Sequence, residues 1–215
     1  MHKILFCLNF THLQTCVEAD IIDVSREDKN MAIKDATKNI FAGELIEMVK
    51  KMPIEKVRVG DLCKRCGADR RTFYYHFMDK YDLVAWIFTR DYTASLEAEQ
   101  GNYTLQHSIN ILEKMYQNKE FYKAAFSDNS QNAIRHYTYK FFYDLGTDAM
   151  KKHFGLDVLP TDMEYAVISH SHATIEITME WLLGKLDYTP EQFARLQYHF
   201  MPQDLKDAYG IEGEF

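Results

Sequence analysis

Residues 59–77, VGDLCKRCGADRRTFYYHF, restrict the fold more than any other part of the chain. They contain two short helix-forming stretches that are separated by about three residues, 67–69. Glycine is favoured in the left-handed position just after a helix, as at Gly67, and aspartate is a good N-cap for a following helix, as at Asp69. Two short helices joined by such a turn predict a helix-turn-helix motif.

The second of these helices has two different faces. Phe73 and Phe77 are four positions apart, so at about 100° per residue they share one face and predict an anchor to a core. The opposite face carries a cation, a hydroxyl and a ring, with a further ring and an imidazole at its sides: Arg71, Thr72 and Tyr75 on the face, Tyr74 and His76 beside it. Such a row is typical of a helix that enters the major groove of DNA.

Positive charge is concentrated in the same segment. The 215-residue chain has 32 Asp and Glu against 25 Lys and Arg, which gives a net charge of −7. Residues 56–80 nevertheless carry seven positive and three negative side chains, so the segment is +4 and the remainder about −11. A basic module on an acidic body indicates that one end meets phosphates. The alternative is that the Arg-Arg-aromatic run is only a solvent-exposed helix face packed beside a core. The turn before this helix and the spacing of its residues argue against that alternative.

The chain as a whole predicts helices, because only four prolines and nine glycines occur among its 215 residues. We expect helices over roughly 105–117, 119–126 and 131–153. The next helix is expected to start at Thr161, with a capping box to Glu164, and the last at Thr189, with Pro190 in its first turn. The chain is therefore predicted to be all-α, with an extension over 1–30, a DNA-binding domain over 31–85 and a helical regulatory and dimerisation domain over 86–215.

Residues 1–30 do not fit the pattern that follows, and two explanations are open. Either Met31 is the natural start, or the segment is a genuine flexible arm. A short apolar run after Lys3 is interrupted by Asn9 and is followed by no clear cleavage site, which argues against a secretory signal. The chain has no apolar run long enough to span a membrane, and its four cysteines are too few for a disulfide framework, so we expect a reduced cytoplasmic protein.

The segment VRVGDLCKRCGADRRTFYYHFMDKYDL, residues 57–83, resembles the DNA-binding signature of the TetR/AcrR family of bacterial regulators. The matching positions lie in register over residues 35–85: Val57, Val59, Asp61, Leu62, Gly67, Thr72, Phe73, Tyr74, Phe77, Lys80 and Leu83. RRTFYYHFMDKYDLVAWIF further resembles the branch that includes regulators of dihydroxyacetone-kinase operons. EFYKAAF and MEWLLGKLDYTPEQFARLQYHFMP resemble the C-terminal region of that branch.

This resemblance implies roles for residues at matching positions. Arg70, Arg71, Thr72 and Tyr75 would face bases and the adjacent backbone, and an arginine can pair with guanine through two hydrogen bonds. Tyr74, His76 and Lys80 would hold phosphates, Lys80 from the N-terminus of the next helix. Two positions depart from the family pattern. Arg58 stands where a capping Thr or Ser is common, although it could still contact a phosphate, and Gly60 replaces a residue that is commonly polar or basic.

The resemblance also implies a homodimer that binds a near-palindromic operator in double-stranded DNA. The helix that starts at Thr161 is apolar on two sides and could face both its own core and a partner. We therefore expect this helix and the one after it to form the dimer interface, with Ile175, Trp181 and Phe193 near it. The family further implies an effector pocket in the aromatic-rich C-terminal body. Whether the effector is a small molecule or a protein co-regulator is open, as is activation or repression.

Other functional signals are weaker. Cys63 and Cys66 form a CxxC that could be a zinc half-site or a redox pair, but no second CxxC or CxxH exists, so small packing residues are the favoured interpretation. His172 and Glu176 have the spacing of a metal pair, although a core or interface histidine is favoured.

We expect no cofactor, no metal and no enzymatic activity. The alternatives are a ligand- or protein-sensing adaptor without DNA activity, which Arg70 and Arg71 argue against, and a small helical enzyme.

Overall fold

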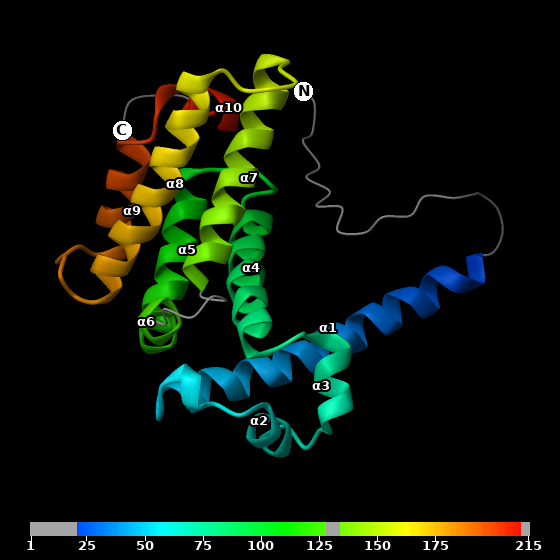
Figure 1. Ribbon diagram of the computed structural model, residues 1–215. Coiled ribbons are helices and arrows are strands. Elements are labelled where there is room, and N and C mark those ends of the chain that lie inside the picture. The colour runs from blue at the N-terminus through cyan, green and yellow to red at the C-terminus, as the bar shows by residue number, and fades with distance from the viewer. Residues whose placement is uncertain (1–20, 128–133, 212–215) are drawn as a thin grey trace.

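The computed structural model describes residues 21–127 and 134–211, with side chains described from residue 35 onward. These parts are all-helical and contain no strand, which confirms the predicted fold class (Figure 1). The helices are α1 (Ile21–Val49), the 3₁₀ turn η1 (Ile54–Lys56), α2 (Val59–Arg65), α3 (Arg70–His76), α4 (Lys80–Ala98), α5 (Leu105–Gln117), α6 (Lys119–Ser127), α7 (Ile134–Phe154), α8 (Thr161–Leu182), α9 (Pro190–His199) and α10 (Gln203–Tyr209).

The helices form a small module and a larger bundle. Helices α1, α2 and α3 lie together at one end of the molecule, and α4 runs from them into a bundle with α5, α7, α8 and α9 (Figure 1). Helix α6 lies at the end of the bundle that faces α1. The expected boundary at residues 85 and 86 falls inside the continuous helix α4, so α4 belongs to both parts. The division into domains stays a prediction.

Helix α1 begins at Ile21, within the expected extension over residues 1–30. No glycine or proline occurs over residues 21–42, so nothing in the sequence interrupts the helix there. Residues 21–30 of the expected extension are therefore helical. Residues 1–20 lie outside the described residues, and the hypothesis of a natural start at Met31 stays a prediction.

Side-chain caps mark the starts of α3, α4, α5 and α9. Thr189 forms the expected capping box with Gln192, and Pro190 occupies the first turn of α9. Thr161 does not cap α8, because the N-cap is Pro160 and Thr161 is already inside the helix. The side chain of Glu164, expected to complete that box, instead accepts a hydrogen bond from Tyr143 at 3.0 Å.

Helix α10 is not predicted by the sequence, which indicates an end at Pro202. Proline is favoured at helix starts as well as after helix ends, and here Pro202 precedes a new helix. Leu205 of α10 is fully buried against α7 and α8, in a small second core at the far end of the bundle. Within residues 21–127 and 134–211, no helix is long and apolar enough to cross a bilayer.

Two histidines of the body are held neutral by burial, which lowers the pKa of both His107 and His170 to about 4. The unfolded value is about 6.5, so the unfolded chain takes up protons first as the pH falls. The free energy of unfolding should therefore be highest above about pH 6.5 and should fall by roughly 2 kcal/mol per histidine at pH 5. Urea unfolding at pH 7.5 and pH 5 measures this. His170→Gln should remove about half of the pH dependence, and an unchanged slope would contradict the assignment.

Candidate nucleic-acid interface

Helix α3 is fixed to the module by its two phenylalanines. Phe73 is fully buried and packs edge-to-face against Phe41 of α1, with ring centroids 5.3 Å apart. Phe77 packs edge-to-face against the same ring at 6.5 Å and against Trp86 of α4 at 6.0 Å. Truncating a buried phenylalanine to alanine costs about 3–5 kcal/mol. This cluster therefore determines which face of α3 points outward.

The turn between α2 and α3 has the predicted chemistry. Gly67 has φ of 63°, a left-handed conformation that side chains with a Cβ rarely adopt. The amide of Ala68 donates to the carbonyl of Cys63 at 3.0 Å and closes the end of α2. Asp69 caps α3 by accepting from the amide of Thr72 at 2.7 Å, and its hydrogen bonds to Thr72 lower the pKa of its carboxyl.

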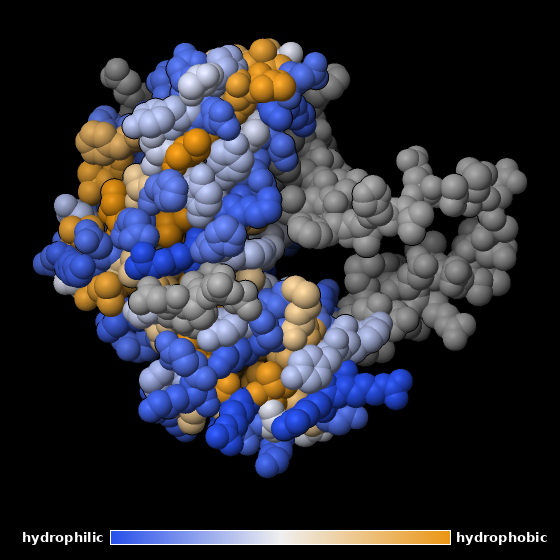
Figure 2. Space-filling view, viewed as in Figure 1, coloured by the Kyte–Doolittle hydropathy of each residue, from blue (hydrophilic) through white to orange (hydrophobic). Residues whose placement is uncertain are grey.

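The outward side of this short helix carries the side chains predicted to read DNA. Arg71 is exposed, and the rings of Tyr74 and Tyr75 are 55% and 67% exposed. Thr72 and His76 are half-buried, the former beside the capping Asp69. Figure 2 shows hydrophilic side chains over much of the end of the molecule where α2 and α3 lie. The structure therefore brings these five predicted residues together on one helix.

Arg70 lies across the first turn of α2, which the sequence does not predict. A Cβ added at Gly60 would lie 2.6 Å from Nη2 of Arg70 and 3.2 Å from its Nε. The absence of a side chain at Gly60, noted as a departure from the family pattern, thus makes room for the guanidinium. Arg58, at the N-cap of α2, is exposed and makes no side-chain capping bond, as the missing hydroxyl predicts.

Lys80 has two backbone partners that the sequence does not predict. Its Nζ donates to the carbonyl of Glu55 at 2.8 Å and to that of Val57 at 3.1 Å. Both carbonyls belong to the connection that leads into α2, far from Lys80 in the sequence. Lys80 therefore ties the start of α4 to this connection, and the phosphate contact that the resemblance implies for it stays a prediction.

The remaining cations of the module divide into paired and exposed groups. Arg65 forms an ion pair with Glu44 of α1 at 2.6 Å, and Lys64 lies 3.9 Å from Asp61. Among the described residues, no ion pair is made by the three arginines nearest the outward side of α3, which are Arg58, Arg70 and Arg71. Their charge is therefore available to an anionic partner.

The two cysteines are packing residues of α2. Cys63 is buried and Cys66 is half-buried, and both are free thiols. Burial raises the pKa of both, for Cys66 to about 11, so the thiolate needed for metal binding or redox chemistry is disfavoured. In the part of the chain with described side chains, no cluster of three metal-binding residues occurs. Glu176, considered with His172, pairs instead with Arg135 at 2.6 Å.

The three residues expected at a dimer interface lie inside the chain's own body. Ile175, Trp181 and Phe193 are 5%, 3% and 2% exposed. The rings of Trp181 and Phe193 lie 4.9 Å apart, and the indole donates to the carbonyl of Tyr188 at 2.8 Å. Side chains with so little surface cannot contribute much to a contact with a second copy. They hold α8 and α9 together, and the dimer interface expected near them stays a prediction.

Two family models match the chain. The model of "Bacterial regulatory proteins, tetR family" matches residues 47–87, and that of "Transcriptional regulator C-terminal region" matches residues 102–203. The first match covers α2, α3 and the first part of α4 but only the end of α1, and the second covers most of the body.

Two individual proteins are also similar. The HTH-type dhaKLM operon transcriptional activator DhaS of Lactococcus lactis subsp. lactis (strain IL1403) is 24% identical over 98 residues. That match covers 45% of this chain and 52% of the relative, so it spans about half the relative's length. A solved structure described as dihydroxyacetone kinase operon activator DhaS has 16% identity and a TM-score of 0.54. It covers 77% of this chain and 93% of its own, and it supports the fold alone.

Lys80→Met should destabilise the module, because it removes two hydrogen bonds from a cation to backbone carbonyls while retaining the length of the side chain. We expect a loss of about 1–3 kcal/mol in the free energy of unfolding, measured by urea denaturation. Lys64→Met is the matched control, since the Lys64 side chain is 83% exposed. Equal stability of the two variants would show that the tether contributes nothing.

Proposed function

Because the chain belongs to the TetR family of bacterial regulatory proteins, we propose that it is a homodimeric transcriptional regulator whose α3 helix reads an operator in double-stranded DNA. The observation that carries the proposal is the orientation of α3, with Phe73 and Phe77 buried and Arg71 and Tyr75 projecting from the basic end. The proposal assigns no catalytic step to the chain, and its site of action is the cytoplasm.

Within this proposal the exposed residues have two kinds of contact. Arg71, Thr72 and Tyr75 contact base edges, since they share the face of α3 opposite the buried Phe73 and Phe77. Four further side chains flank that side and contact the sugar-phosphate backbone: Arg58, Arg70, Tyr74 and His76. The position of Arg70 over Gly60 supports a contact with the backbone of the DNA strand nearest α2. The family resemblance also allows Arg70 to contact a base.

Arg71→Ala should reduce discrimination at one base position by about 1–3 kcal/mol, because a bidentate pair with a base is lost. Selection of bound sequences from a random DNA pool measures this, together with the half-site spacing. Arg195→Ala is the control, because Arg195 is an exposed cation on α9, paired with Glu191 and far along the chain from α3. An adaptor without DNA activity would enrich no sequence, and equal losses in both variants would contradict the role of Arg71.

Dimerisation is proposed because one helix-turn-helix reads too few base pairs, and two copies are needed about 34–36 Å apart or at a multiple of that distance. The outer sides of α8 and α9 support a contact there. They carry apolar side chains that are 38–75% exposed: Tyr165, Ile177, Leu196 and Phe200. The small residues Ser169 and Ala173 lie between Tyr165 and Ile177 along α8 and would permit close approach. A two-fold axis through this surface would form an isologous four-helix bundle.

Phe200→Glu should convert the dimer to monomers, because a charge would be buried in the proposed contact without a partner. Sedimentation at micromolar concentration measures the change, and operator binding should be lost while the helical content is retained. Val158→Glu is the control, since Val158 is 77% exposed in the connection before α8. A Phe200→Glu protein that stays dimeric would move the interface to another surface.

Regulation through the body is proposed because one chain of polar contacts joins the module to the bundle through α4. Arg90 donates to the side chain of Asn39 on α1 at 3.0 Å and to Oδ1 of Asp91 at 2.7 Å. Asp91 is 5% exposed, and its Oδ2 accepts from the hydroxyl of Tyr122 on α6 at 2.7 Å. A ligand or partner that displaces α4 or α6 would therefore disturb contacts to α1, which supports the module that carries α3.

A further inference from the structure

We propose that the cavity inside the bundle binds a small uncharged molecule with a hydroxyl group at one end and an apolar remainder. The inference rests on the proposed function, in which the body controls operator binding, and it specifies what the body detects. Two buried polar atoms support it, Nε2 of His107 and the hydroxyl of Tyr92, which have no partner among the described residues. The contrast between a polar end and a mainly apolar end of the cavity supports it as well.

The cavity has a volume of about 50 Å³ and is enclosed by all of the helices from α4 to α9. One buried water needs at least about 10–15 Å³ on this scale, so the space suits a ligand of roughly three to five non-hydrogen atoms. No carboxylate, ammonium or guanidinium lines the space. A charged ligand would lose its hydration without gaining an opposite charge, so the occupant is uncharged.

His107 of α5 presents an unpaired hydrogen-bond acceptor at the wall of this cavity. Its Nδ1 lies 2.9 Å from Oγ of Ser95, and that hydroxyl lies 2.7 Å from the carbonyl of Tyr92. A carbonyl can only accept, so Ser95 gives its hydrogen to Tyr92 and must receive one from Nδ1 of His107. The tautomer is fixed with hydrogen on Nδ1, which leaves Nε2 as an acceptor. The histidine is 1% exposed, and Nε2 has no partner among the described residues.

Tyr92 of α4 supplies a donor from the same wall. Its side chain is 4% exposed, and its hydroxyl also has no partner within the described part of the chain. The rings of Tyr92 and His107 lie edge-to-face with centroids 4.7 Å apart. A ligand hydroxyl placed within reach of both atoms can donate to Nε2 of His107 and accept from Tyr92. A carboxylate has no hydrogen for Nε2, and an ammonium has no lone pair for Tyr92.

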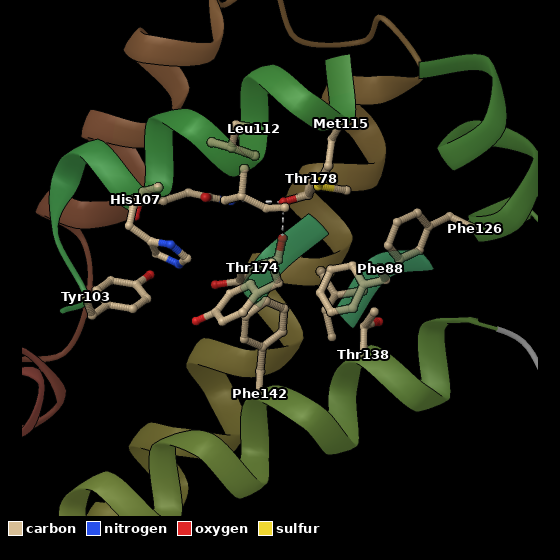
Figure 3. A pocket seen from close by; sticks show the side chains of 15 residues that line it. Phe88, Tyr103, His107, Leu112, Met115, Phe126, Thr138, Phe142, Thr174 and Thr178 are labelled. Atoms are coloured by element: carbon tan, nitrogen blue, oxygen red, sulfur yellow. Dashed lines mark hydrogen bonds between the residues drawn. The ribbon is translucent and has the colours of Figure 1, made fainter. Parts of the chain in front are cut away.

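The other end of the cavity is mainly apolar, and the hydroxyl of Thr138 at that end already donates to the carbonyl of Ile134. In Figure 3, His107 and Tyr103 lie at one end of the space, and Phe88 and Phe126 lie at the other. Leu112, Met115 and Ile175 complete the apolar lining. A ligand would therefore place its hydroxyl towards α5 and its hydrocarbon part towards α6. Phe88 and Tyr92 both belong to α4, the helix that also carries Arg90 and Asp91.

The test uses the full-length protein with three probes: 1-butanol, butyrate and xenon. 1-Butanol has the required hydroxyl and five non-hydrogen atoms, and butyrate has the same carbon skeleton with a carboxylate. With ¹⁵N-labelled histidine, 1-butanol should shift the Nε2 resonance of His107 saturably, with a dissociation constant of about 1 mM or below. Butyrate at equal concentration should cause no shift. An absent shift with 1-butanol, or an equal shift with butyrate, would overturn the proposal.

Tyr92→Phe provides a second measurement. The variant should bind 1-butanol about tenfold more weakly, since one hydrogen bond is lost. Without ligand it should be at least as stable as the original protein, because the deleted hydroxyl has no protein partner. Tyr122→Phe is the matched control: it loses the bond to Asp91, so it should be less stable but should bind 1-butanol normally. Xenon, which needs no hydrogen bond, should bind the original protein and Tyr92→Phe alike and so report an intact cavity. Unchanged 1-butanol affinity in Tyr92→Phe would overturn the assignment.

Ligand binding and DNA binding are tested separately. If the protein enriches an operator from random DNA but 1-butanol causes no shift of the His107 resonance, the ligand proposal alone is overturned. A 1-butanol shift without any enriched sequence would overturn the DNA function alone.

Discussion

The edge-to-face contact between Phe41 and Phe73 is the interaction on which the rest of the structure depends. A helix of seven residues is far too short to be stable by itself in water, so α3 exists only because its inner face is buried. The same burial fixes its rotation about its own axis. Phe77 extends the contact to Trp86 and thereby attaches the module to the first half of α4.

Helix α4 carries three consecutive residues with three different surroundings. Arg90 bonds to Asn39 of the module, Asp91 bonds to Tyr122 of the body, and Tyr92 lines the cavity. The angle of about 100° between successive positions makes this arrangement unavoidable for adjacent residues on a helix. A small rotation of α4 would therefore change all three surroundings together. Ligand binding inside the bundle could therefore alter the contact between α4 and α1, the helix against which α3 packs.

The sequence predicted the features that depend on near neighbours. The left-handed Gly67, the cap at Asp69 and the two faces of α3 all follow from spacing within a few residues. It did not predict features created by contacts between distant segments. The carbonyl partners of Lys80 lie more than twenty positions earlier in the chain. An apolar stripe likewise cannot show what covers it, so the sequence placed Ile175, Trp181 and Phe193 near a dimer interface without showing that all three are buried within their own chain. Helix α10 was missed because Pro202 permits both an end and a start.

The position of Arg70 over Gly60 brings the two helices of the motif together through a charged side chain. A side chain at position 60 would meet the flexible end of this guanidinium, which would have to move aside. The direction in which Arg70 reaches from α3 therefore depends on the residue in the first turn of α2. An engineered change of DNA preference at Arg70 thus has to consider α2 as well as the helix that faces the bases.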